Sequence, residues 1–315
     1  MEIFRSNPTL SRLFEENCTE YSDEIIWVLQ EAELNRLTLR YISPQITFRS
    51  ILVELIREVG QQQNLRRTTV HLAIYLMDSF MDNHNIAQNR LKLTALSCIL
   101  LAAKIEENEP KVPTLERMNK LLKPKCPLSD FVVLEVVLLK FFNWHLLIPT
   151  TAVFVEYWLL HIVSKVDFGP SVSEDQYFER RSRAAELVLE FLDVTLLDIT
   201  MTNVRPSLLA AACMAATRAI LSVKRTWNNS MIKLTGYTYD EICFLMRALM
   251  NGRACLISDT ISRKRTILDS GYMTDPDQEY DDDDDQDDVM VAPDDVSSAD
   301  DDVVFVCKSK RARLE

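Results

Sequence analysis

The sequence is short of residues and motifs that many enzymes and membrane proteins need. Only five glycines are dispersed over 315 residues, and none belongs to a GxGxxG, P-loop or HExxH motif. The longest apolar runs have about 11 to 13 residues, short of the roughly 20 that cross a bilayer. The first residues also lack the charged and then apolar pattern of a secretory signal. These absences argue against a glycine-rich phosphate-binding loop and against a membrane anchor. We therefore expect a soluble intracellular protein.

Cysteine and histidine are too few and too scattered to build a disulfide framework or a metal centre. The seven cysteines are odd in number and never form a CxxC pair, and none of the four histidines has a second ligand at metal-binding spacing. We therefore expect reduced thiols in the core and neither a metal nor a cofactor.

The net negative charge of the chain comes from one region. The segment 269–302 contains sixteen acidic residues and no lysine or arginine, so the rest of the chain has a net charge of +4 although the whole has −12. High charge and few apolar residues predict a disordered acidic tail over residues 255–315.

Apolar residues recur at helical spacing through the rest of the chain. One helix is expected from Ser22 within an N-terminal segment, residues 1–43. The first domain, residues 44–146, is predicted to hold five helices at 48–60, 66–81, 91–103, 112–122 and 128–144, the first of them ended by Gly60. The third is apolar all round, which indicates a buried helix, and Lys104 follows at its end.

A second set of five helices is predicted in residues 147–254, at 151–163, 179–197, 206–221, 228–237 and 239–251. The middle one is rich in alanine, which suits the centre of a bundle because neighbours can approach it closely. No run of strands is indicated. The predicted fold is therefore all-α, with two tandem five-helix domains, an N-terminal helix and an acidic tail.

The sequences of several of these helices resemble segments of a known protein family. The segments RSILVELIREVG, HLAIYLMDSFM, LKLTALSCILLAAKIEE and LEVVLLKFFNWHLLIPT, in this order, resemble the first cyclin box of the cyclins. RPSLLAAACMAATRAIL followed by LTGYTYDEI resembles the second box. The likeness covers about residues 20 to 252, and FFNWHLLIPTTAVFVEYWL is most similar to J-type cyclins.

The resemblance implies an activating, specificity-setting subunit of a cyclin-dependent protein kinase, with no catalytic residues of its own. In cyclins the residues matching Lys104 and Glu135 hydrogen-bond the backbone around the kinase αC helix, and those matching Ile105, Val136, Leu139 and Leu146 supply an apolar surface. Without the resemblance, Lys104 reads as a solvated helix end and Glu135 as a surface acid.

Two further sets of residues match positions of the family. Arg49 and Asp78 match a buried ion pair that braces the first helix against the second. A substrate-docking patch would use Phe48, Ile51, Leu52, Leu55 and Glu58. The tryptophan of that patch is replaced by Leu55, and Lys92 would repel the arginine of an Arg-x-Leu ligand, so we expect weak docking of that motif.

The acidic tail contains three short motifs besides its solubilising charge. DSGYMT resembles a phosphodegron in which Ser270 and Thr274 would be phosphorylated and recognised by a ubiquitin ligase. DDDVVFV resembles a SUMO-interacting strand formed by Val303, Val304, Phe305 and Val306. Basic clusters at 263–265 and 308–313 could direct nuclear import, so we expect a nuclear protein that can also be cytoplasmic.

Two alternatives use the same fold. TFIIB-like factors with cyclin-type domains bind DNA, but a body with a charge of only +4 makes a nucleic-acid partner a poor fit. A cyclin-fold adaptor that binds a partner without activating a kinase is the other alternative.

Overall fold

The computed structural model describes residues 21–270, apart from the side chains of 22, 23 and 256–270, and within this part it contains helices and no strand. The α-helices are α2 (Ser22–Glu33), α3 (Arg49–Gln62), α4 (Arg67–Asn83), α5 (Leu91–Glu106), α6 (Leu115–Asn119), α7 (Leu128–Phe141), α8 (Thr151–Trp158), α9 (Glu174–Thr195), α10 (Pro206–Ile220), α11 (Asn229–Thr235) and α12 (Tyr239–Ser270). Short 3₁₀ turns lie at Ile46–Phe48, Gln88–Arg90, Glu109–Lys111, Leu159–His161, Lys165–Asp167 and Ile199–Asn203. The predicted all-α fold is confirmed.

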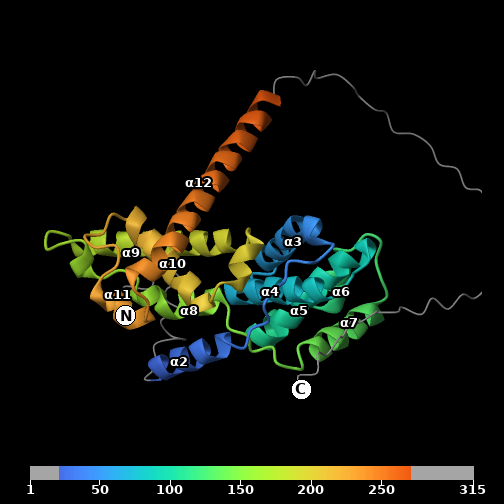
Figure 1. Ribbon diagram of the computed structural model, residues 1–315. Helices are drawn as coiled ribbons and strands as arrows, with labels where there is room; N and C mark the ends of the chain where they lie inside the picture. Colours follow the sequence, from blue (N-terminus) through green and yellow to red (C-terminus); the bar gives the residue numbers. More distant parts are fainter. Residues whose placement is uncertain (1–20, 271–315) are drawn as a thin grey trace, which may run out of the picture. The chain divides into compact units, whose positions relative to one another are not determined.

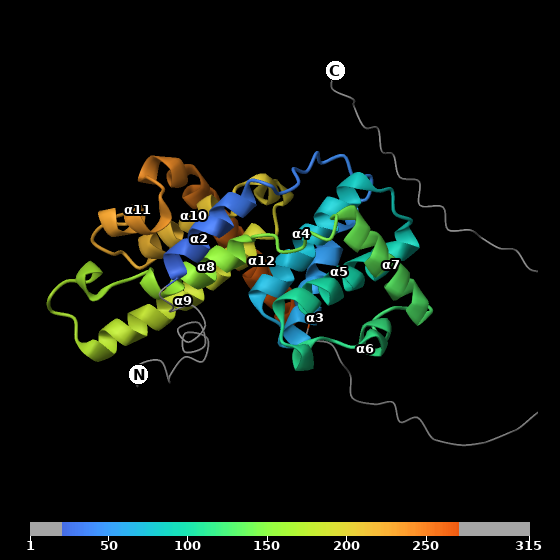
Figure 2. The same cartoon turned by 90° about the horizontal axis from the view of Figure 1, so that it is seen from below.

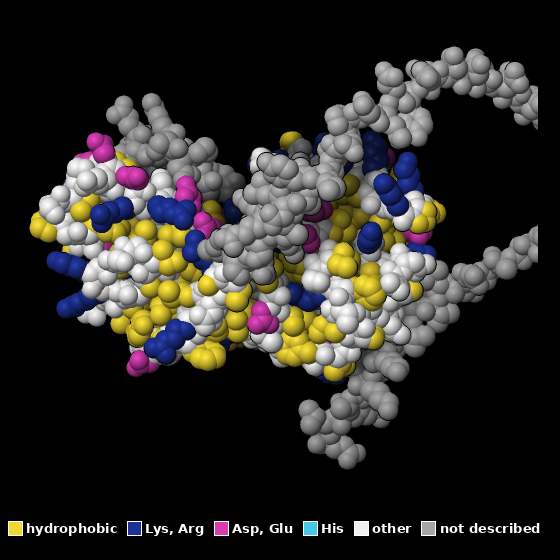
Figure 3. Space-filling model, turned by 90° about the horizontal axis from the view of Figure 1, so that it is seen from above, with side chains coloured by type: hydrophobic (Ala, Val, Ile, Leu, Met, Phe, Trp, Pro, Cys, Tyr) yellow, Lys and Arg dark blue, Asp and Glu magenta, His cyan; other side chains and the backbone are white. Residues whose placement is uncertain are grey.

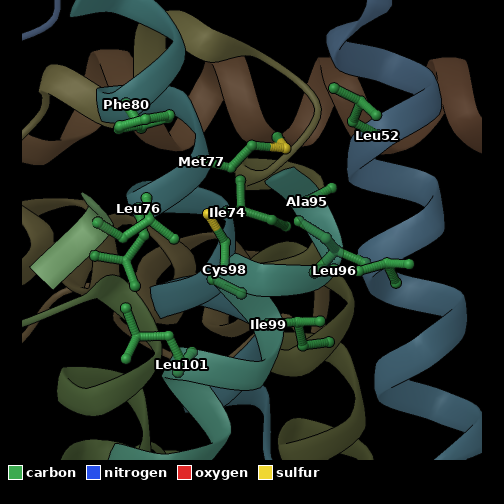
Figure 4. Close-up of a cluster of buried hydrophobic side chains, with 14 of the residues drawn as sticks. Leu52, Ile74, Leu76, Met77, Phe80, Ala95, Leu96, Cys98, Ile99 and Leu101 are labelled. Carbon is green, nitrogen blue, oxygen red and sulfur yellow. The ribbon is translucent and has the colours of Figure 1, made fainter. Parts of the chain in front are cut away.

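The first box is a bundle of α3 to α7 around α5 (Figure 1). Twelve of the sixteen residues of α5 are buried, because α3, α4 and α7 pack around it. Figure 4 shows side chains of α3, α4 and α5 that meet in this core, among them Leu52, Met77, Phe80 and Ile99. The sequence was therefore correct about the buried central helix.

The second box consists of α8 to α11 and the first part of α12, with α10 at its centre (Figure 1). Alanines line α10, and α8 and α9 pack closely on it. The N-terminal helix α2 lies along α8, as Figures 1 and 2 both show, so it belongs with the second box although it precedes the first in the chain.

One predicted helix end is wrong for a clear physical reason. The helix α3 does not stop at Gly60 but continues to Gln62. A Cβ atom placed on Gly60 would lie 2.5 Å from Cγ2 of Val70. The glycine is therefore needed for the close approach of α3 and α4. In a sequence, a glycine at a close helix contact cannot be distinguished from a glycine that ends a helix.

Two other helices are longer than predicted. The helix α9 begins at Glu174, five residues earlier than expected, because Ser173 and Gln176 form a capping box. The helix α12 continues to Ser270, past residue 255 where the sequence placed the start of the tail. No proline or glycine interrupts residues 253–270, so the backbone can remain helical where the composition becomes polar.

Candidate functional site

The centre of the candidate site is an ion pair on the surface of the first box. Nζ of Lys104, in the last turn of α5, lies 2.6 Å and 2.7 Å from the two carboxylate oxygens of Glu135 on α7. The lysine is exposed and the glutamate is half-buried. Packing of α7 against α5 brings the two residues together across 31 positions of sequence. An ammonium and a carboxylate thus stand side by side facing solvent.

Glu107 has a different task, although it lies only three residues after Lys104. Its Oε1 accepts hydrogen bonds from the backbone N–H of Arg66 at 2.5 Å and from Oγ1 of Thr69 at 2.7 Å. Arg66 occupies the N-cap position of α4 and gives no side-chain cap of its own. Glu107 therefore caps α4 from the end of α5. The sequence reasoning missed this role, for which the poor cap residue at 66 was the available signal.

The four apolar residues predicted beside the ion pair differ in their exposure. Val136 on the outer side of α7 has 38% of its surface exposed, and Ile105 and Leu139 are half-buried against the core. Leu146 is only 6% exposed. In this conformation Leu146 belongs to the core of the first box and offers no surface to a partner.

Exposed apolar residues that the sequence reasoning did not single out extend this surface. Val132 and Val133 lie on the outer side of α7 with about half of their surface exposed. In the turn after α7, Trp144 is 67% exposed and Leu147 is 88% exposed. The available signal was α7 itself, which has apolar residues on every side although only one side can face the core. A helix of this kind with one open side indicates an interaction surface.

Arg49 and Asp78 form a buried bidentate ion pair, with Nε and Nη2 of Arg49 each 2.9 Å from a carboxylate oxygen. Nη1 of the same arginine donates to the carbonyl oxygens of Leu196 and Leu197, at 2.9 Å and 3.3 Å. The arginine therefore joins three elements: α3, α4 and the end of α9. Its contact with the second box was not anticipated.

The predicted docking patch on α3 is only partly at the surface. Ile51 and Glu58 are exposed, and Phe48 and Leu55 are half-buried. Leu52 is 2% exposed and packs in the core, so it is not available to a ligand. Figure 3 views the side of the molecule on which α3 lies in Figure 1, and it shows hydrophobic side chains among basic and acidic ones.

The predicted tail motifs lie at or beyond the end of the described residues. Ser270 is the last residue of α12, and Thr274, the strand at 303–306 and the basic cluster at 308–313 fall outside. Within residues 21–270, no cluster of three potential metal ligands is found. Among the helices described there, none has the length and hydropathy needed to cross a membrane.

Comparison with known proteins places both helical bundles in one class. The model of the cyclin N-terminal domain matches residues 24–147, and that of the cyclin C-terminal domain matches residues 149–256. The fold is similar to a viral cyclin from herpesvirus saimiri, with a TM-score of 0.57, 15% identity, and coverage of 73% of this chain and 96% of that one. The molecule is thus a tandem cyclin-domain protein.

The chain belongs to the cyclin family. It is 36% identical to Cyclin-J of Xenopus laevis over 222 residues, which are 69% of this chain and 58% of the relative. It is 30% identical to the Cyclin-J-like protein of Mus musculus, covering 78% of this chain and 66% of the relative, and 29% identical to Cyclin-A1 of Mus musculus, covering 76% and 53%. The chain therefore spans somewhat less than two thirds of the length of these curated relatives.

Proposed function

We propose that this cyclin is the activating, specificity-setting subunit of a cyclin-dependent protein kinase in cell-cycle regulation. It contributes no catalytic residues, and the kinase supplies ATP binding, magnesium and phosphoryl transfer. The observation that carries the proposal is the exposed Lys104–Glu135 pair beside the open apolar side of α7. The similarity to a chain in the structure of the CAK complex from Chaetomium thermophilum bound to ATP-γ-S, with a TM-score of 0.50 and 14% identity, supports the fold on which the proposal rests.

The ion pair suits the recognition of backbone groups. An ammonium group has three donors, of which Glu135 uses two, and a carboxylate has acceptor sites beyond the two that Lys104 occupies. Lys104 can therefore donate to a carbonyl and Glu135 can accept from an N–H of the same partner segment. Such charge-assisted hydrogen bonds are shorter and stronger than neutral ones.

The expected partner segment is the αC helix of the kinase. A kinase site is complete only when αC is turned in and its glutamate pairs with the ATP-binding lysine. A subunit that binds the inward position of αC better than the outward one shifts the kinase toward its active state. The valines at 132, 133 and 136 give this contact an apolar component that salt does not screen.

The proposal is tested with the full chain and a panel of monomeric cyclin-dependent kinases, by measuring complex formation and histone phosphorylation. We expect the wild type to bind and activate at least one kinase, and a folded Lys104→Ala, Glu135→Ala variant to do neither. Binding without phosphorylation would favour the adaptor alternative. Salt-sensitive DNA binding with no kinase binding would favour the TFIIB-like alternative.

For the tail we propose nuclear import and regulated turnover, on the sequence motifs alone. A fluorescent fusion should lose nuclear accumulation when the basic residues at 263–265 and 308–313 are replaced by alanine.

Replacing Ser270 and Thr274 by alanine should lengthen the half-life of the protein. A Val303, Val304 and Phe305 triple alanine variant should lose SUMO binding. Unchanged behaviour in any of the three assays removes the corresponding motif from the proposal.

A further inference from the structure

A pocket of about 470 Å³ opens between three segments of the chain that are far apart in sequence. The end of α2 and the segment after it form one wall, which includes Ala32 and Leu37. The turn between α7 and α8 forms the opposite wall, which includes Leu147, and Tyr75 of α4 lies between them. This volume is within the range of about 300 to 1,000 Å³ that is typical of ligand-binding clefts.

The pocket has both apolar and polar lining residues, and among the polar atoms Nε of Arg36 is buried without a hydrogen-bond partner. The hydroxyl of Tyr75 accepts a hydrogen bond from the N–H of Leu37 at 2.8 Å and lies 3.4 Å from the carbonyl oxygen of the same residue. The guanidinium of Arg36 lies over the Tyr75 ring, 4.3 Å from its centroid. Phe142 and Pro149 add buried apolar lining. A ligand that brings an apolar side chain together with an acceptor group can therefore bury apolar surface and also supply a partner for Arg36.

The turn that forms one wall is held in an unusual backbone conformation. Asn143 and Trp144 both have positive φ angles, of 50° and 64°. The N–H of Trp144 donates to the carbonyl of Leu139 at 2.8 Å, and the N–H of His145 donates to that of Phe142 at 2.9 Å. Two consecutive left-handed residues without glycine store strain, and such strain gathers at functional sites. The turn keeps the indole of Trp144 and the side chain of Leu147 in solvent.

The pocket lies at the C-terminal end of α7, the helix that also carries Glu135 of the ion pair. Phe141 lines the pocket and lies about 9 Å farther along α7 than Glu135. The ionisable side chains among the lining residues are Arg36, Tyr75 and His145, and no carboxylate is among them. A side chain that enters the pocket next to an acceptor group would therefore meet favourable electrostatics.

We propose that this pocket is a second anchor point for the kinase, receiving one aromatic or branched aliphatic side chain whose neighbouring carboxylate or carbonyl faces Arg36. The inference rests on the proposed function, because it takes the bound kinase as the partner. Lys104 and Glu135 hold the backbone of the partner, whereas the pocket selects among kinases by the side chain that each presents. An apolar anchor in a pocket is the kind of contact that dominates binding energy at interfaces.

The test fills the pocket without touching the ion pair. Ala32→Phe places a bulky side chain at a lining position, and Glu31→Phe places the same side chain one residue away on the exposed side of α2. The dissociation constant for the kinase is measured for both full-length variants and the wild type, with a thermal unfolding curve for each. We expect Ala32→Phe to weaken binding at least tenfold and Glu31→Phe to change it less than twofold.

The outcomes separate the two proposals. If the wild type binds no kinase, the proposed function fails and the anchor fails with it. If the wild type binds and Ala32→Phe binds equally well, the anchor is wrong while the function stands. Should Ala32→Phe unfold, Leu37→Ser serves as a second variant, because it removes apolar surface from the same wall and leaves the pocket open. An unchanged dissociation constant for that variant would likewise overturn the anchor.

Discussion

The two cyclin boxes each bury an arginine, but they use it in opposite ways. Arg218, at the end of the central helix α10, pairs with Asp167 through both carboxylate oxygens, at 2.6 Å and 3.0 Å, and donates to the carbonyls of Ile162, Arg225 and Thr226. All of these partners lie within the second box. Arg49 of the first box pairs with Asp78 and then reaches the carbonyl of Leu196 in the second box. The Arg218 network thus lies within the second box, whereas the Arg49 network joins the two boxes.

The caps of two buried helices show a related contrast. In the first box Glu107 caps α4 from the end of α5, a neighbour within the same bundle. In the second box Glu33 of α2 accepts hydrogen bonds from the N–H and hydroxyl of Ser207, at 2.9 Å and 2.6 Å, and so caps α10. The N-terminal helix therefore completes the second box.

The outer surfaces differ as well. In the first box α7 leaves a row of valines in solvent beside an exposed ion pair. In the second box the Arg218–Asp167 pair is buried in the interior. The difference indicates that the second box, completed by α2, is a support and that the first presents the partner surface. Four predictions test this division.

The largest effect is expected from Arg218→Met. The substitution leaves the buried carboxylate of Asp167 without its cation, which should lower the free energy of unfolding by about 3 to 5 kcal/mol. Urea denaturation measures it. Arg183→Met is the control, because Arg183 pairs with Glu186 at the surface and should cost less than about 1 kcal/mol. Equal costs for the two variants would contradict the role of Arg218 as an internal brace of the second box.

Glu33→Ala should have the next largest effect. It leaves the N–H of Ser207 at the start of α10 without its acceptor, at a cost of about 1 to 3 kcal/mol. Hydrogen exchange should accelerate in the first turn of α10 and not in α5. Glu31→Ala, on the exposed side of the same helix, is the control and should leave both rates unchanged. Uniform acceleration through both boxes would show that α2 is not specifically part of the second.

Acid should weaken the second box through Asp167. Burial alone would raise the pKa of this carboxyl, but hydrogen bonds from Arg218 and Ser164 outweigh burial and hold the pKa below its ordinary value of 3.8. The stabilisation is therefore present above about pH 4 and is lost as the pH falls through the lower folded-state value. The unfolding free energy of wild type should decline more steeply between pH 4 and pH 2 than that of Asp167→Asn. Parallel declines would exclude Asp167 as the titrating group.

The smallest effect on stability is expected at the candidate site. An ion pair with an exposed lysine contributes little, so Lys104→Met should change the free energy of unfolding by less than about 1 kcal/mol. The measurement is again urea denaturation, with Arg183→Met as a matched surface control. A loss comparable to that of Arg218→Met would mean that the pair mainly holds α5 and α7 together.

Much of the fold could be predicted from the sequence because helical periodicity and the family segments span both boxes. The buried α5 and the alanine-rich α10 are examples, since their composition alone indicates a central helix. Gly60 was misread because a close helix contact and a helix stop both call for glycine. The Ser173 capping box was overlooked in a polar segment.

The candidate site was predictable to a smaller extent. Lys104 and Glu135 follow from the family segments, and the structure brings their charges together. The burial of Leu146 and Leu52, and the exposure of Trp144 and Leu147, depend on how helices far apart in sequence pack. The role of Glu33 depends on α2 crossing to the second box, which no local pattern of residues 22–33 indicates.

The most direct test of the central claim exchanges the two charges. In the Lys104→Glu, Glu135→Lys variant the ion pair between α5 and α7 can form again, but the donor and the acceptor offered to a partner have changed places. The dissociation constant for the kinase is measured for this variant and for the wild type, after urea denaturation has shown equal stability. The account predicts that the exchanged protein stays folded and binds at least 100-fold more weakly. Binding at the wild-type level would contradict it, because the pair would then serve only the fold.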